Sequence, residues 1–98
     1  MPEISKPLCT IDPDLLDHLR QLPKEKRSIV GTVIESVRQA WGAPHAHSGI
    51  GIRNLGSAIY ECRIGLNQRL VFQSLENGLY FHFLGTHDEV KRFLRSHR

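Results

Sequence analysis

The apolar residues in the first half of the chain recur at the spacing of a helix face. Between positions 15 and 22, four leucines share one side of a helix. Asp12 followed by Pro13 is typical of an N-cap residue and the first residue of a helix. Pro23 cannot continue that helix, although it can begin another. The pattern therefore predicts a first helix that starts at Pro13 and ends before Pro23.

A second and longer stripe follows at the same spacing. Gly42 is placed to end this segment, and Pro44 prevents the helix from continuing. The two segments together predict a helical hairpin with one apolar face. The apolar positions of the second segment are Ile29, Val30, Val33, Ile34, Val37, Ala40 and Trp41.

The period changes from helical to alternating in the second half of the chain. In IYECRIG, Cys62 lies on the opposite face to Glu61 and Arg63, and in QRLVFQS, Leu70 lies opposite Arg69. The segment LYFHFLG is apolar on both faces, which indicates a buried strand. Turn residues at 65–68 and 76–78 join the three segments as an antiparallel meander.

These elements predict one α+β domain over residues 1–98. The helical hairpin should cover the apolar face of the meander, which leaves Glu61, Arg63 and Arg69 on the opposite face. A short strand within residues 4–11 is also expected, although Pro7 interrupts it.

The stretch LGTHDEV begins a short C-terminal helix. Thr86 and Glu89 have the spacing of a capping box, in which each side chain bonds the backbone amide of the other. Asp88 adds negative charge where the helix dipole favours it. These roles explain the two carboxylates, but His87 is left without a structural explanation.

Two histidine-containing patterns are candidates for a metal site. His87, Asp88 and Glu89 are consecutive, so on a helix they point around the axis and do not converge on one ion. His45 and His47 form only a weak HxH pattern in a loop. We therefore expect no metal ion and no other cofactor.

The positive charge lies in the second half of the chain. Residues 50–98 hold seven Lys or Arg and four Asp or Glu, whereas residues 1–49 hold six of each, so the formal net charge of +3 belongs to the strands and the last helix. A basic face of this kind favours a polyanionic partner, although it is also compatible with an ordinary solvated surface.

The chain shows the features of a cytoplasmic protein. It has no signal-type stretch at its N-terminus and no apolar run of about 18 residues, so no membrane segment is expected. Its two cysteines, Cys9 and Cys62, lack CxxC spacing and are expected to be reduced.

The polar face of the predicted sheet suits the chemistry of an RNA phosphodiester. His87 follows the last strand, and that strand end should lie near Arg63 and Arg69. Cleavage needs a base for the 2′-hydroxyl, cations for the phosphate oxygens and an acid for the leaving 5′-oxygen. A histidine, two arginines and a carboxylate can supply all of these without a metal. A pairing of Glu61 with Arg63 is an equally ordinary alternative, and His82 is more simply a core histidine.

The order of these pieces resembles the RelE/ParE toxin superfamily. Two helices precede IRNLGSAIYECRIGLNQRLVF and LYFHFLGTHDEVKRF, and the resemblance covers residues 12–95. The matching motifs are Leu55-Gly56, Tyr60-Glu61-Cys62-Arg63, Gly65, Arg69-Leu70-Val71-Phe72 and Gly85-Thr86-His87.

The resemblance implies the toxin of a type II toxin–antitoxin system that cleaves mRNA on the ribosome and is neutralised by an antitoxin. Arg69 falls where RelE-like proteins place a phosphate-contacting arginine, and His87 falls where several place a catalytic group. Glu61 is a candidate second acid or base. Operator DNA would be contacted only through the antitoxin. The residues expected to contact RNA phosphates are Arg63, Arg53, Lys91 and Arg92.

The chain also departs from the RelE-like pattern. It has no lysine between Lys26 and Lys91, and Phe93 stands in the region where some members place a tyrosine. These departures favour the alternative of a non-enzymatic relative, either a ParE-like inhibitor of DNA gyrase or an inactive RelE-like binding module.

Overall fold

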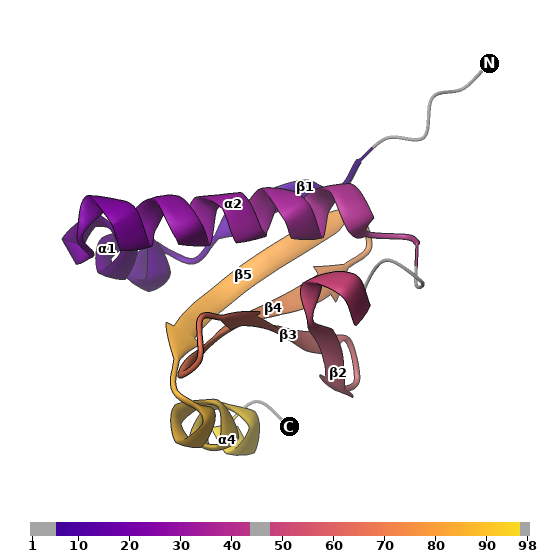
Figure 1. The fold of residues 1–98 in the computed structure, drawn as a ribbon. Coiled ribbons are helices and arrows are strands. Elements are labelled where there is room, and N and C mark those ends of the chain that lie inside the picture. The colour runs from indigo at the N-terminus through magenta and orange to yellow at the C-terminus, as the bar shows by residue number, and fades with distance from the viewer. Residues whose placement is uncertain (1–5, 44–47, 97–98) are drawn as a thin grey trace.

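The computed structural model describes residues 6–43 and 48–96, which form a sheet with helices on both faces (Figure 1). The sheet has five strands in the order β1-β5-β4-β3-β2, and only β1 and β5 are paired in parallel. Two helices lie on one face and the C-terminal helix lies on the other. The elements are β1 (Leu8–Ile11), α1 (Pro13–Gln21), α2 (Lys24–Ala40), the 3-10 turn η1 (Ser48–Ile50), β2 (Ile52–Gly56), β3 (Ile59–Ile64), β4 (Gln68–Leu75), β5 (Gly78–Gly85) and α4 (His87–Ser96).

The main core lies between the sheet and the helical hairpin. Helix α1 packs on β5 and α2 packs on β3, which buries Leu15 and Val37 in the same core cluster as Phe72 of the central strand. Trp41, at the C-terminal end of α2, contacts Tyr60 edge-on, with ring centroids 4.8 Å apart. This aromatic contact fixes the end of the longest helix to the sheet. The predicted α+β architecture is therefore confirmed.

The helix termini follow the sequence signals. The Asp12 side chain accepts a hydrogen bond from the Asp14 amide at the start of α1. At α4 the Thr86 amide donates to Glu89 Oε1 at 2.7 Å, and the Glu89 amide donates to Thr86 Oγ1 at 3.3 Å. The predicted capping box is thus present. None of the described helices is long and apolar enough to cross a membrane.

A bulge in β5 explains why LYFHFLG is apolar on both faces. Val71 of β4 is opposite Phe83, but the next residue, Phe72, is opposite Phe81, so His82 is the extra residue. The extra residue reverses the alternation beyond it. Leu84 therefore joins the core under α1 and α2, whereas Phe83 joins a second cluster under α4.

One strand is not predicted from the sequence, and the limits of another differ from the prediction. Ile52–Gly56 forms β2, so the antiparallel meander has four strands where three were predicted. This strand carries a register shift beside Gly56 (φ 112°), which disrupts the alternation. The expected N-terminal strand is present as β1 and begins after Pro7. Residues 4 and 5 of that expectation lie outside the described residues.

We expect a pair of glycine substitutions to change stability in opposite directions. A Cβ at Gly78 would collide with the carbonyl oxygen of Leu8 on the neighbouring parallel strand. Gly78→Ala should therefore lower the free energy of unfolding by about 1–3 kcal/mol. Gly31→Ala, in an exposed part of α2 with nothing nearby, should raise it by about 0.5–1 kcal/mol. Urea unfolding of the two variants measures both, and equal effects would contradict the close approach of β1 to β5.

Candidate functional site

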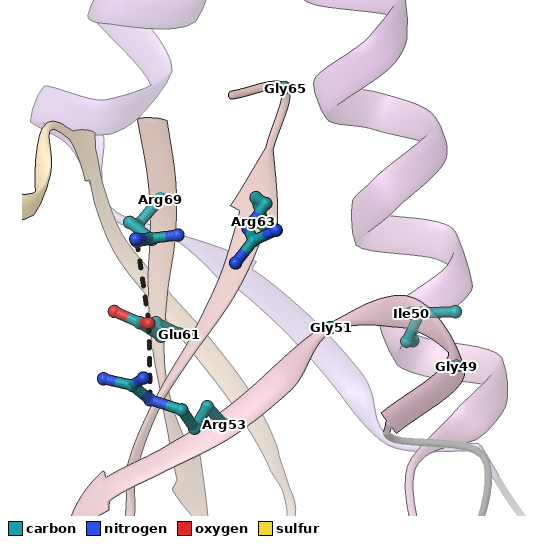
Figure 2. Close-up of a pocket in the computed structure, with 8 residues that line it drawn as sticks. All are labelled: Gly49, Ile50, Gly51, Arg53, Glu61, Arg63, Gly65 and Arg69. Carbon is teal, nitrogen blue, oxygen red and sulfur yellow. Dashed lines mark ion pairs between the residues drawn. The ribbon is translucent and has the colours of Figure 1, made fainter. Parts of the chain in front are cut away.

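The polar face of the sheet is hollowed beside its β3–β4 turn. The hollow is a cavity of about 570 Å³, which is within the range of ligand sites. Its walls are the ends of β2, β3 and β4 together with the glycine-rich turn before β2 (Figure 2). The lining residues are Gly49, Ile50, Gly51, Arg53, Glu61, Arg63, Gly65 and Arg69.

Glu61 is the buried carboxylate at the centre of this cavity. Its side chain is only 6% exposed, and its Oε2 lies 3.6 Å from Arg69 Nε and 3.7 Å from Arg53 Nε. The sheet register causes this arrangement, because Arg53 is directly opposite Glu61 on β2 and Arg69 is diagonal to it on β4. The alternative pairing of Glu61 with Arg63 is absent among the described residues.

Positive charge exceeds negative charge in the cavity. Arg63 and Arg69 are directly opposite on neighbouring strands, an arrangement that is unfavourable unless an anion lies between the two charges. In the described part of the chain Arg63 makes no ion pair. Three guanidinium groups therefore face a single carboxylate, and the surplus of two positive charges favours an anionic ligand.

Arg53 and Arg69 both approach Glu61 through Nε. In each pair the shortest contact joins Nε to Glu61 Oε2, and each guanidinium group has further N–H donors on its Nη atoms. Arg69 Nε is itself buried, and the described residues give it no hydrogen-bond partner. Guanidinium groups held in this way match the oxygens of a phosphate group.

A glycine-rich turn forms the remaining wall. Gly51 has a left-handed backbone (φ 78°), and an added Cβ there would lie 3.8 Å from the Cβ of Arg63. The buried thiol of Cys62 donates to the carbonyl oxygen of Ile50 at 3.1 Å. Burial raises the pKa of this thiol to about 11, so it remains protonated at neutral pH and keeps the turn in place. This wall is not predicted from the sequence, where the run SGIG is its only local signal.

The other predicted site residues lie on α4. His87, Lys91 and Arg92 are exposed, and none of them lines the cavity. His87 begins the helix two residues after Gly85, which is directly opposite Arg69. Hydrogen bonds from Thr86 lower the pKa of Glu89, in agreement with its role as a capping residue. The structure thus brings the sheet residues together and leaves His87 outside the cavity lining.

The described histidines do not belong to a metal-binding cluster. Within residues 6–43 and 48–96, no three His, Cys, Asp or Glu side chains lie close enough to hold a metal ion. His45 and His47 lie outside the described residues. His82 is half-buried and hydrogen-bonded to Gln73 (2.9 Å), as expected for a structural histidine.

Known structures share this fold. No family model matches the sequence, and no curated protein matches it. The RelE of an archaeal RelE–RelB complex from Pyrococcus horikoshii aligns with a TM-score of 0.67 at 15% identity, over 84% of this chain and 96% of that one. A free toxin RelE variant from E. coli aligns with a TM-score of 0.66 at 15% identity, over 92% of this chain and 93% of that one. A YoeB–YefM complex from Staphylococcus aureus aligns with a TM-score of 0.61 at 21% identity, over 85% of this chain and 99% of that one. The chain therefore has the RelE-like toxin fold.

We expect the negative charge of Glu61 to reduce the repulsion among the arginines. Bound phosphate should supply part of that negative charge when Glu61 is neutralised. Glu61→Gln keeps the side-chain shape but removes the charge, so the free energy of unfolding should fall by about 1–3 kcal/mol in chloride buffer. Phosphate at matched ionic strength should restore more stability to this variant than to the wild type. Thermal unfolding in the two buffers measures the difference, and identical phosphate effects would contradict an anion site at Glu61.

Proposed function

We propose that the chain is the toxin of a type II toxin–antitoxin pair and that it cleaves mRNA on the ribosome. One observation carries the proposal: a cavity of the RelE-like fold holds three arginines around one buried carboxylate. A single-stranded RNA phosphodiester suits this combination, because its anionic oxygens need cations and its 2′-hydroxyl needs a base.

The proposed reaction uses side chains of this chain alone. Glu61 takes the proton of the 2′-hydroxyl, and the 2′-oxygen forms a bond to phosphorus. Arg69 and Arg63 stabilise the charge that develops on the phosphate oxygens. The bond from phosphorus to the 5′-oxygen breaks, and His87 supplies a proton to that oxygen. The products are a 2′,3′-cyclic phosphate and a 5′-hydroxyl end.

The proposed protein partner is a cognate antitoxin. The structural matches include RelE in complex with RelB and YoeB in complex with YefM. An antitoxin of this chain would place acidic residues of a strand or an amphipathic helix against the basic face. Any binding to operator DNA is assigned to the antitoxin.

Expression of the chain alone tests the proposed activity. Translation should stop after induction, and mapping of mRNA 5′ ends should show new ends within reading frames. Translation that continues with intact mRNA would overturn the nuclease proposal. A DNA-damage response with intact mRNA would instead support inhibition of DNA gyrase.

We expect Arg69→Ala to lower mRNA cleavage by programmed ribosomes at least about 100-fold, because it removes a charge at the reacting phosphate. Arg20→Ala is the matched control. Arg20 pairs with Asp17 on the solvent side of α1, and both side chains are 67% exposed. Circular dichroism should show both variants folded. Cleavage by Arg69→Ala at the rate of the control would remove Arg69 from the site.

We expect Glu61→Gln and His87→Gln each to slow single-turnover cleavage by about 100-fold, as for loss of a general base or acid. Because His87 does not line the cavity, its variant is the sharper test. An unchanged rate in His87→Gln would show that the leaving oxygen takes its proton from another source. An unchanged rate in Glu61→Gln would leave Glu61 only the role of holding the arginines.

A further inference from the structure

Leu66 is a large apolar residue in full contact with solvent. Its side chain is 91% exposed, more than any other large apolar side chain in the described residues. It lies in the turn between β3 and β4, within the sequence Gly65-Leu66-Asn67. Turns of this kind favour glycine, asparagine and other small or polar residues, and the fold gains nothing from a leucine there. The side chain of Leu66 therefore contributes little to the hydrophobic core and is free to contact a ligand.

The position of Leu66 relative to the arginines suggests a reason. Its neighbour Gly65 lines the cavity, and Arg63 and Arg69 lie three residues before and three residues after it. Consecutive Cα atoms are about 3.8 Å apart, so Leu66 lies at the edge of the cavity beside these two arginines. Figure 2 shows Gly65 at the end of β3, beyond Arg63.

A polynucleotide in the cavity would bring an apolar surface to this edge. The arginines bind phosphate, which carries no apolar surface, but each phosphate is joined to nucleosides whose bases have apolar faces. Proteins that bind single-stranded RNA commonly pack side chains against unstacked bases. Leucine can also contact base faces, because it is among the residues that insert between the base steps of duplex DNA. The cavity has a surplus of positive charge at one place. A nucleic acid can meet it with a single phosphate, whereas an acidic protein segment would need several carboxylates close together.

We infer that Leu66 packs against the base of a nucleotide next to the phosphate that Arg63 and Arg69 bind. The inference rests on the proposed function and adds a base-contacting residue to it. Leu66 is neither an acid nor a base, so its contribution is to binding and to the placement of the nucleotide. The β3–β4 hairpin carries both arginines on its paired strands and Leu66 in its turn.

Two oligonucleotides separate a base contact from a phosphate contact. The first is a single-stranded RNA of about eight nucleotides, with 2′-methoxy groups to prevent cleavage. The second has the same sugars and phosphates but lacks the bases. Wild-type protein, Leu66→Ser, Leu8→Ser and Arg69→Ala are titrated with each by fluorescence anisotropy. Leu8, on the outer strand β1, is 74% exposed and is the matched control for the loss of an exposed leucine.

Leu66→Ser should weaken binding of the first oligonucleotide about fivefold to tenfold, because the base loses an apolar contact. It should not change binding of the oligonucleotide without bases. Leu8→Ser should match the wild type with both, and Arg69→Ala should weaken both. Leu66→Trp should bind the first oligonucleotide more tightly than the wild type, because an aromatic ring stacks on a base.

Equal binding by Leu66→Ser and the wild type, or equal losses with both oligonucleotides, would overturn the inference while leaving the proposed function in place. No binding of either oligonucleotide by the wild type would overturn the proposed phosphate site itself. The exposed side chain makes misfolding of Leu66→Ser easy to exclude, because its thermal unfolding should equal that of the wild type.

Discussion

The bulge at His82 is the constraint on which the arrangement of this protein depends. Beyond it, Phe83 faces α4 and Leu84 faces the helical hairpin, which is the reverse of their positions in a strand without the bulge. A regular strand would place Phe83 beside Phe81 under the hairpin. The cluster under α4 would then lose the ring that stacks on Phe93, with centroids 5.0 Å apart. The bulge therefore places an aromatic ring, Phe83, in the cluster under α4, and Leu84 in the core under the hairpin.

The same arrangement determines which part of the polar face is covered. Helix α4 packs over β4 and β5, where Val71 is buried beneath it. Arg69, two residues earlier on the same face of β4, remains 21% exposed and lines the cavity. The functional side chains thus lie next to a packed cluster on strands whose register is fixed. Rigid strands are a good support for groups that must meet a phosphate in one geometry.

Electrostatic balance explains how three arginines are tolerated there. Arg63 and Arg69 would repel each other across the strands. Glu61 reduces the repulsion among the three arginines, because its carboxylate pairs with Arg69 and Arg53. Because the compensation is incomplete, the free protein keeps a surplus of positive charge at one place. This is the usual exchange of some stability for a binding site, since a phosphate can supply the missing negative charge.

The sequence by itself determined the local elements. The caps at Asp12 and Thr86, the two amphipathic helices and the alternation of β3 and β4 follow from short-range spacing, and each is present in the structure. It also placed Glu61, Arg63 and Arg69 on one face, because alternation assigns faces without knowledge of strand partners. The strand β2 escaped prediction because a register shift and Gly56 interrupt its pattern.

Only the tertiary structure decided which of these residues meet. Arg53 reaches Glu61 because β2 pairs with β3 in one register, and a chain pattern contains no information on register between strands that have irregular alternation. The glycine-rich wall and the distance of His87 from the cavity lining likewise depend on how separate segments pack. Spacing along the chain specifies strand faces and helix ends. The contact of Arg53 and Arg69 with Glu61 requires strand pairings between distant segments, which form only when the chain folds.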